Sequence, residues 1–279
     1  MIVTIVGIGL IGGSMALALK KHGIATHCIG VDENQIHQQQ AIALGLVDEI
    51  LPLEKAIETS DLIILAIPVG ALMTLLPTIL DKVNKQVVID VGSTKAGILS
   101  AVKDHKNRKR FVPTHPMWGT EFSGPQAAES NAFIDKACVI CNKQENDKDA
   151  ETLVENIYRK LGMHIVYMDA KEHDVHVAYV SHISHITSFA LANTVLEKEK
   201  EEDAIFELAS GGFESTVRLA KSNPATWSSI FKENRENVLD VLNEHISQLR
   251  KFKASLEKEN YEYLEELMTN ANKIKRILK

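Results

Sequence analysis

Short runs of valine, isoleucine and leucine alternate with helix-like segments through the first two-thirds of the chain. The runs predict strands at residues 2–6, 27–31, 62–67, 86–90, 111–114, 137–140 and 164–167. Between the early runs, residues 12–22 and 33–44 carry helical patterns. Apolar strands that alternate with helices are typical of a parallel sheet covered on both faces. We therefore expect an α/β domain over residues 1–169, built on a doubly wound, mostly parallel sheet.

The pattern changes after Asp169. From residue 170 onward no segment has the pattern of a strand, and apolar residues recur at helical spacing, as at Val238, Val241 and Leu242. Charges of both signs fill the positions between them, which indicates long amphipathic helices. We expect an all-α domain over residues 170–279, and we expect its helices to pair two copies of the chain as a homodimer.

Composition excludes several classes of protein. The chain is 45% hydrophobic and 24% charged, with a net charge of −6, which argues against a nucleic-acid binder. Residues 1–19 and 62–80 lack charged side chains, but glycines or prolines interrupt both stretches. We therefore expect a cytoplasmic protein. Cys138 and Cys141 lie three apart on an expected strand and so point to opposite faces, which favours buried thiols over a metal or redox pair.

A glycine motif follows the first expected strand. Residues 7–12 read Gly7, Ile8, Gly9, Leu10, Ile11 and Gly12, the pattern G-x-G-x-x-G, and a helical segment comes next. In this context Gly7 permits a tight turn, Gly9 lets the backbone approach a pyrophosphate, and Gly12 lets helix and strand pack closely. The start of the helix offers free N–H groups to the phosphates.

The choice between NAD and NADP rests on Asp32, which lies 20 residues after Gly12 at the end of the second expected strand. A carboxylate there can accept hydrogen bonds from the adenosine ribose hydroxyls and would repel a 2′-phosphate. No lysine or arginine occurs between Lys21 and Lys55 to bind such a phosphate. The sequence therefore predicts NAD.

His115 stands where an expected strand runs out into a loop, at the edge of the sheet where a bound dinucleotide places its nicotinamide. A neutral imidazole there can accept a proton from a substrate hydroxyl while hydride leaves the adjoining carbon. Ser93, which follows another expected strand, can hydrogen-bond this imidazole and orient it. Two interpretations stay open: His115 as a histidine that tethers a loop, and Ser93 as the N-cap of a helix.

Further candidates lie in the helical part. His182 and His185 are three apart and share a helix face, and His173 and His176 precede them. No zincin-type pattern and no suitably spaced carboxylate or thiolate accompanies the four histidines, so we predict substrate contacts rather than a metal. Arg218 follows a glycine-rich bend, where its guanidinium can bind a carboxylate bidentately, although a surface arginine is the simpler interpretation.

Taken together, these motifs resemble the prephenate dehydrogenase family, which includes arogenate dehydrogenases. The resembling stretches are GIGLIGGS (7–14), DVGSTK (90–95), HPMWGTE (115–121), SHISH (181–185) and GGFESTVRLAKSNPATWSSIFKEN (211–234). They occur in order through nearly the whole chain. One departure is Ser215, which stands where family members often carry aspartate.

The resemblance implies an NAD-dependent oxidative decarboxylation of prephenate to 4-hydroxyphenylpyruvate, a step of tyrosine biosynthesis. It implies that His115 is the catalytic histidine, that Ser93 holds it, and that Arg218 binds a substrate carboxylate. The residues that it implies around the substrate are His182, His185, Glu121 and Trp227. The implied fold is a Rossmann domain followed by a helical dimerisation domain.

Three alternatives remain open at this stage. The first is another Rossmann-plus-helical dehydrogenase, of the β-hydroxyacid or imine-reductase type, although those enzymes typically carry a catalytic lysine where this chain offers histidines. The second is an NAD-binding sensor without turnover. The third is arogenate as the true substrate, since arogenate differs from prephenate by an amine in place of the keto group.

Overall fold

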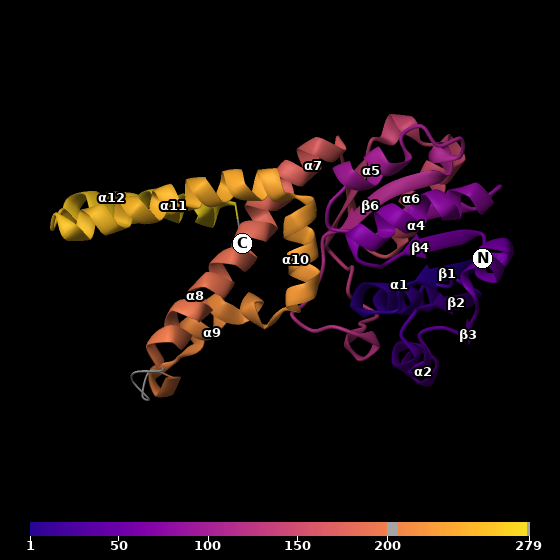
Figure 1. Ribbon diagram of the computed structural model, residues 1–279, viewed down its shortest axis with the longest axis horizontal. Helices are drawn as coiled ribbons and strands as arrows, with labels where there is room; N and C mark the ends of the chain where they lie inside the picture. The colour runs from indigo at the N-terminus through magenta and orange to yellow at the C-terminus, as the bar shows by residue number, and fades with distance from the viewer. Residues whose placement is uncertain (200–205, 278–279) are drawn as a thin grey trace. The chain divides into compact units, whose positions relative to one another are not determined.

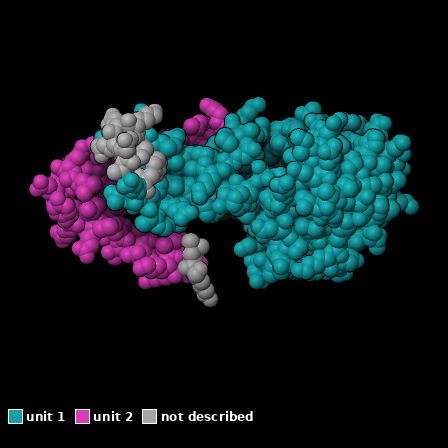
Figure 2. All heavy atoms as spheres, turned by 90° about the horizontal axis from the view of Figure 1, so that it is seen from below, with its two compact units in different colours: residues 1–234 teal, residues 235–279 magenta. Residues whose placement is uncertain are grey.

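A computed structural model describes residues 1–199 and 206–277 of the chain (Figure 1). Packing divides the chain into two compact units, residues 1–234 and residues 235–279 (Figure 2). Among the described residues, no helix is long and apolar enough to cross a membrane.

The first unit is built on one eight-stranded sheet, with the strand order β3-β2-β1-β4-β5-β6-β7-β8. The strands are β1 (Ile2–Val6), β2 (His27–Val31), β3 (Glu49–Ile50), β4 (Leu62–Leu65), β5 (Val87–Asp90), β6 (Phe111–Pro116), β7 (Ala137–Cys141) and β8 (His164–Met168). All neighbours are parallel except β6 and β7, which are antiparallel. The order reverses between β1 and β4, the position where doubly wound sheets bind ligands.

Helices cover both faces of this sheet. Those of the first unit are α1 (Leu10–Lys21), α2 (Gln35–Ala43), α3 (Leu53–Thr59), α4 (Val69–Lys82), α5 (Ala96–Val102), α6 (Lys148–Lys160), α7 (Ala170–Val177), α8 (Ile183–Glu199), α9 (Gly211–Val217) and α10 (Pro224–Glu233). Short 3-10 segments join several of them, and a π-helical turn, Ala178–His182, links α7 to α8.

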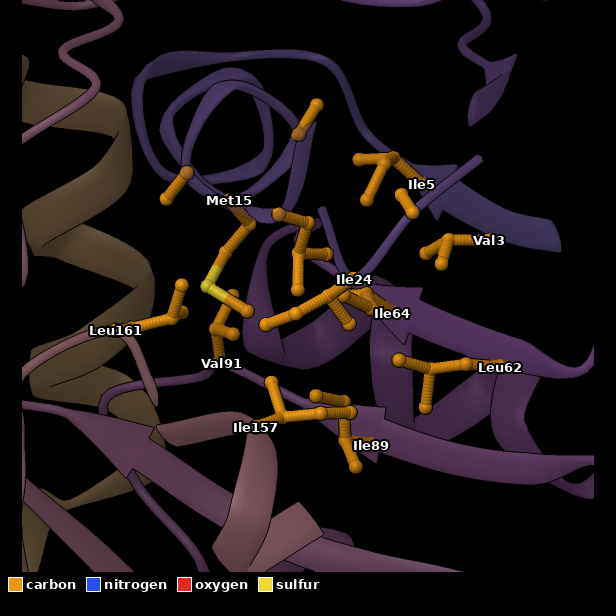
Figure 3. Close-up of a cluster of buried hydrophobic side chains, with 14 of the residues drawn as sticks. Val3, Ile5, Met15, Ile24, Leu62, Ile64, Ile89, Val91, Ile157 and Leu161 are labelled. Atoms are coloured by element: carbon orange, nitrogen blue, oxygen red, sulfur yellow. The ribbon is translucent and has the colours of Figure 1, made fainter. Parts of the chain in front are cut away.

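Two hydrophobic cores hold these layers together. Successive strand residues point to opposite faces, so Ile64 of β4 belongs to one core and Ile63 to the other. The first core joins the sheet to α1 and α6, and Figure 3 shows part of it, including Met15, Ile64 and Ile157. The second core joins the opposite face to α3, α4 and α5. The predicted doubly wound α/β fold is confirmed.

The strand predictions were accurate at most ends. β1 and β2 have the predicted bounds, and the other predicted strands differ by one or two residues. The two-residue β3 was missed, because a pair of residues carries no periodicity. β6 runs two residues beyond the predicted end, since Thr114, His115 and Pro116 pair with β7.

Every element between residues 170 and 277, within the part that the structure describes, is helical. The packing units nevertheless divide at residue 234, because α7 packs on α5 and β7, and α10 packs on α4. The boundary at residues 169 and 170 therefore stays a prediction about where the α/β pattern ends. The second unit consists of α11 (Arg235–Glu257) and α12 (Tyr261–Ala271), which pack against each other, and a 3-10 turn.

Candidate active site

The glycines of the motif have the backbone geometry that a close-packed strand–helix turn needs. Gly7 has φ of +90°, and a Cβ there would lie 2.5 Å from the carbonyl oxygen of Ala66. A Cβ on Gly12 would lie 2.0 Å from the carbonyl oxygen of Gly7, so only glycine allows α1 to pack this closely on β1. A Cβ on Gly9, by contrast, would meet nothing within 4 Å. Gly9 therefore borders open space.

The start of α1 presents unpaired N–H groups beside this space. Gly9 is the N-cap and provides no side-chain cap. The first N–H bonded within the helix is that of Gly13, which donates to Gly9 at 2.8 Å, so the amides of Leu10, Ile11 and Gly12 precede the helical ladder. Such amides, together with the helix dipole, bind phosphate groups. The residues present fit a dinucleotide.

Asp32 follows β2 at the same edge of the sheet. Its Oδ2 accepts the N–H of Ile8 at 2.8 Å, and its Oδ1 accepts the N–H of Asn34 at 2.8 Å. Only 11% of its side chain is exposed. These two bonds fix the carboxylate next to the glycine turn, where the ribose of a dinucleotide lies in folds of this type.

His115 belongs to β6 and lies beyond the end of β5, the neighbouring strand in the sheet. The last β5–β6 pair is Asp90 with Pro113, so His115 extends two residues past β5 while still paired with Val139 of β7. Its side chain and that of Thr114 point to opposite faces of the sheet. The sheet thus holds the backbone of His115 in place and leaves its side chain on the face that carries α5 and α7.

The imidazole of His115 is hydrogen-bonded to a second histidine. Its Nδ1 lies 2.8 Å from Nε2 of His173 in α7, and Nδ1 of His173 lies 2.8 Å from Oδ1 of Asp174. The Asp174 carboxylate accepts the backbone N–H of Lys95 at 2.7 Å and that of Ala96 at 2.9 Å, which caps the start of α5. Burial, reinforced by the nearby His173 and Lys95, lowers the pKa of His115 well below its usual value. The imidazole is therefore neutral at neutral pH and can act as a base.

Ser93 does not make this hydrogen bond. The interaction of His115 Nδ1 is with His173, and Ser93 lies half-buried two residues before Lys95, the N-cap of α5. The alternative interpretation of Ser93 as a helix N-cap is therefore wrong. Its predicted role of holding the catalytic histidine stays a prediction.

A buried ion pair lies near His115. The Lys95 ammonium contacts Oδ2 of Asp90, and both side chains are 0% exposed. Asp90 also accepts the N–H groups of Gly92 and Thr114, and the Thr114 hydroxyl lies 2.7 Å from that of Tyr158. Burial raises the pKa of Asp90, and the Lys95 cation opposes this effect. This cluster fixes the loop that follows β5.

The predicted histidines of the helical part are buried beside aromatic rings. His185 stacks on Trp227, with ring centroids 3.3 Å apart, and His182 meets the same ring edge to face at 6.0 Å. Burial lowers the pKa of each histidine to about 4, so both are neutral donors or acceptors at neutral pH. Asn234 lies 3.2 Å from Nδ1 of His182 and donates to the carbonyl oxygen of Asp174, which links this group to α7.

Arg218 lies in the 3-10 turn after α9 and is 49% exposed. Its guanidinium donates to Oε2 of Glu121 at 2.8 Å, and Glu121 belongs to the loop that follows β6. A bond to its own backbone and the Arg218 cation lower the pKa of the Glu121 carboxyl. The structure thus pairs two residues that the family resemblance implied at the substrate site and that are 97 positions apart in the sequence.

The predicted site residues fall into two linked groups. A positive charge on His182 would lower the pKa of His115, and the Arg218 cation lowers the pKa of His185, so members of the two groups lie near one another. Sequence reasoning missed His173 and Asp174 as partners of His115. The available signal was a His-Asp pair on the helix that carries the other histidines.

The structure also shows where the cysteines lie and whether candidate metal ligands gather in one place. Cys138 belongs to the first core and Cys141 to the second, so they lie on opposite faces of the sheet, and both thiols are buried and free. Within residues 1–199 and 206–277, no group of three or more His, Cys, Asp or Glu side chains is placed to hold a metal ion. That the histidines contact substrate and bind no metal stays a prediction.

Comparisons with known proteins identify the family. The family model described as "Prephenate dehydrogenase, nucleotide-binding domain" matches residues 15–167, and "Prephenate dehydrogenase, dimerization domain" matches residues 169–270. The chain is 30% identical to the prephenate dehydrogenase of Bacillus subtilis over 266 residues, which cover 94% of this chain and 72% of that protein.

Solved structures agree. The prephenate dehydrogenase of Aquifex aeolicus, solved with hydroxyphenyl propionate and NAD+, has a TM-score of 0.89 and 31% identity, covering 99% of this chain and 97% of that chain. The Synechocystis arogenate dehydrogenase has a TM-score of 0.76 and 25% identity, with both chains covered completely. These likenesses confirm both the resemblance seen in the motifs and the predicted nucleotide-binding domain. The chain belongs to the prephenate dehydrogenase family.

Proposed function

We propose that the protein is an NAD-dependent prephenate dehydrogenase, which converts prephenate to 4-hydroxyphenylpyruvate with loss of CO2. The observation that carries the proposal is a neutral, half-buried His115 at the carboxyl edge of a nucleotide-binding sheet, in a chain of this family. This arrangement offers a base where a bound nicotinamide would lie.

NAD, when bound, supplies the hydride acceptor. The N–H groups of Leu10, Ile11 and Gly12 would hold its pyrophosphate, and Asp32 would accept its ribose hydroxyls. The lack of any lysine or arginine between Lys21 and Lys55 favours NAD over NADP. A kcat/KM that is higher with NADP than with NAD would contradict this part of the proposal.

The roles of the substrate-side residues follow from their chemistry. His115 takes the proton of the ring hydroxyl. Arg218 binds a carboxylate of the dianion, and Glu121 holds the guanidinium at the entrance. His182, His185 and Trp227 line the site with neutral, mostly buried rings, which keeps water from the carboxylate that leaves as CO2.

The test is an assay of purified protein with NAD and either prephenate or arogenate, following the absorbance of reduced cofactor. We expect the higher kcat/KM with prephenate. The likeness to the Synechocystis arogenate dehydrogenase makes arogenate the second candidate, and a higher kcat/KM with arogenate would establish it. Turnover of neither substrate would contradict both proposals.

The variant Arg218→Ala tests the proposal that Arg218 binds a carboxylate of the substrate. Charge-assisted hydrogen bonds are worth about 1.5–3 kcal/mol, so we expect KM for the substrate to rise roughly 10–100-fold, with a smaller change in kcat. Lys221→Ala is the matched control, since Lys221 ends the same 3-10 turn and is 59% exposed. An unaltered KM in Arg218→Ala would remove the assignment.

We also propose that the protein is a cytoplasmic homodimer. The match to the family's dimerization domain supports the dimer, and so do the exposed apolar side chains of the second unit, which include Leu249, Leu256, Tyr261 and Met268. The three free cysteines are consistent with a reducing compartment. Light scattering of the eluted protein should give about 62 kDa, twice 30.9 kDa, and a monomer mass would contradict the dimer.

A further inference from the structure

His173 and Asp174, which follow His115 in a chain of hydrogen bonds, have no role in the function proposed above. Both are buried, with His173 0% and Asp174 3% exposed. They lie on α7, and His173, 58 positions from His115 in the sequence, reaches it because α7 packs on α5 and β7. Buried polar groups that are fully hydrogen-bonded hold one arrangement of their neighbours.

The direction of each hydrogen bond can be worked out from the one group whose role is fixed. Asp174 accepts the backbone N–H groups of Lys95 and Ala96, which can only donate, so both of its carboxyl oxygens act as acceptors. It therefore receives the Nδ1 proton of His173. In a neutral His173 the other nitrogen, Nε2, must then accept, and His115 must donate from Nδ1. The lone pair of His115 is left on Nε2.

We propose that His173 and Asp174 are positioning residues for His115. They hold its imidazole in the tautomer protonated on Nδ1, and they stabilise the imidazolium that forms when Nε2 takes the hydroxyl proton of the substrate. In that step the O–H bond of the substrate breaks, the new N–H bond forms on Nε2, and the proton later leaves to solvent from the same atom. Asp174 stays ionised throughout. This inference rests on the proposed function, because it assigns roles in the same reaction.

The charges around the pair show why an anion is needed there. The groups near the two imidazoles are the Lys95 ammonium, its partner Asp90, the neutral ring of His182, and Asp174 itself. Burial disfavours a positive charge on either imidazole, and Lys95 adds to this effect. Asp174 contacts His173 directly and favours a positive charge on that imidazole. Without Asp174 a second positive charge beside Lys95 would be poorly compensated.

Three variants separate positioning from mere packing. His173→Leu leaves Nδ1–H of His115 unpaired, and we expect kcat to fall roughly 100-fold, within the range for general-base catalysis. His173→Gln can still accept that N–H with its carboxamide oxygen, so we expect kcat at least about tenfold above that of His173→Leu. In both variants KM and the dissociation constant of NAD should stay close to wild type. His176→Gln is the matched control, since His176 is exposed on the same helix and bonds only a carbonyl of that helix.

Asp174→Asn removes the anion and leaves Lys95, Asp90 and His182 unchanged. The cation on the histidine pair is then less favoured, so the acid limb of the kcat/KM–pH profile should move to lower pH, by about one unit or more. The plateau should also fall, because a weaker base transfers protons less well. If Asp174 were needed only for folding, Asp174→Asn would lower the activity in proportion to the folded fraction. The acid limb of the kcat/KM–pH profile would then stay at its wild-type pH.

A readout that needs no turnover completes the test. In protein labelled with 15N-histidine, the spectrum of His115, assigned by its loss in His115→Asn, should show protonated Nδ1 and unprotonated Nε2 at neutral pH. A His115 protonated on Nε2, a wild-type kcat in His173→Leu, or an unmoved acid limb in Asp174→Asn would each overturn the inference. If the wild type turns over neither substrate, the proposed function fails, and the tautomer decides the inference by itself.

Discussion

Replacing Lys95 with methionine should be among the most destabilising single changes in the first unit. Lys95 and Asp90 are both 0% exposed, so the ammonium is the only cation that compensates the Asp90 carboxylate within the described contacts. Methionine keeps most of the volume of the side chain and removes the charge. The variant then contains a buried carboxylate whose described donors are the N–H groups of Gly92 and Thr114.

Breaking a buried pair by removing one partner costs about 3–5 kcal/mol, because the remaining charge is uncompensated. We expect a loss of this size in Lys95→Met, which corresponds to a fall in Tm of roughly 10 °C for a unit of this size. The double variant Asp90→Asn, Lys95→Met should recover part of the loss. Asparagine carries no charge, and its carboxamide oxygen can still accept a backbone N–H.

The assay is urea unfolding followed by circular dichroism, at one fixed protein concentration because a dimer links stability to concentration. Lys82→Met is the control. Lys82 pairs with Glu54 on the surface, with 39% and 72% of the side chains exposed, and exposed pairs are worth about 0–1 kcal/mol. The reasoning would be refuted if Lys95→Met unfolded within about 1 kcal/mol of wild type, or if the double variant were no more stable than the single one.

Three further predictions concern catalysis, the cofactor and pH. His115→Asn should lower kcat by roughly 10²–10⁴ with KM little changed, and steady-state kinetics with near-normal kcat would remove the mechanism. Gly9→Ala should keep its Tm but lose NAD affinity by calorimetry, since its Cβ enters open space beside the phosphate cradle, whereas Gly12→Ala should lose both because its Cβ would lie 2.0 Å from a backbone oxygen. A Gly12→Ala protein with normal Tm would contradict this account of the turn. His182 and His185 have pKa values lowered from 6.5 to about 4, so between these pH values the unfolded chain binds more protons and stability rises with pH. The urea midpoint of unfolding should therefore be higher at pH 7 than at pH 5. If the variant with both histidines replaced by glutamine kept the same difference between the two midpoints, these histidines would not be its cause.

Local patterns were enough to predict the fold class and most of the strands. Runs such as residues 2–6, apolar except for Thr4, indicate strands covered on both faces, their alternation with helices favours a parallel sheet, and the glycine motif marks the first turn. The direction of β7 could not be predicted in this way, because an apolar run reads the same in a parallel and an antiparallel neighbour. The longer β6 follows from that pairing and was missed for the same reason.

The site shows the same limit. Asp32 and the three glycines belong to one motif with fixed spacing, so sequence alone could place them. The partners of His115 could not be found from spacing, since Asp174 reaches the Lys95 backbone across 79 positions through the packing of two helices. Ser93, three residues after β5, belongs to one of the stretches that resemble the family, whereas His173 belongs to none of them, so the sequence favoured Ser93 as the partner of His115.

In the proposed function, the pairing of β6 with β7 fixes the backbone of the base, His115, while Arg218 binds a carboxylate of the substrate. A base held in a backbone ladder has little freedom to follow a different substrate, whereas Arg218 is half exposed on a short turn and is restrained by one carboxylate. On that proposal, substitutions around the turn that carries Arg218 can alter how the substrate is bound without disturbing proton transfer. Sequence differences between relatives that act on prephenate and relatives that act on arogenate, which carries an amine in place of the keto group, are expected to concentrate there.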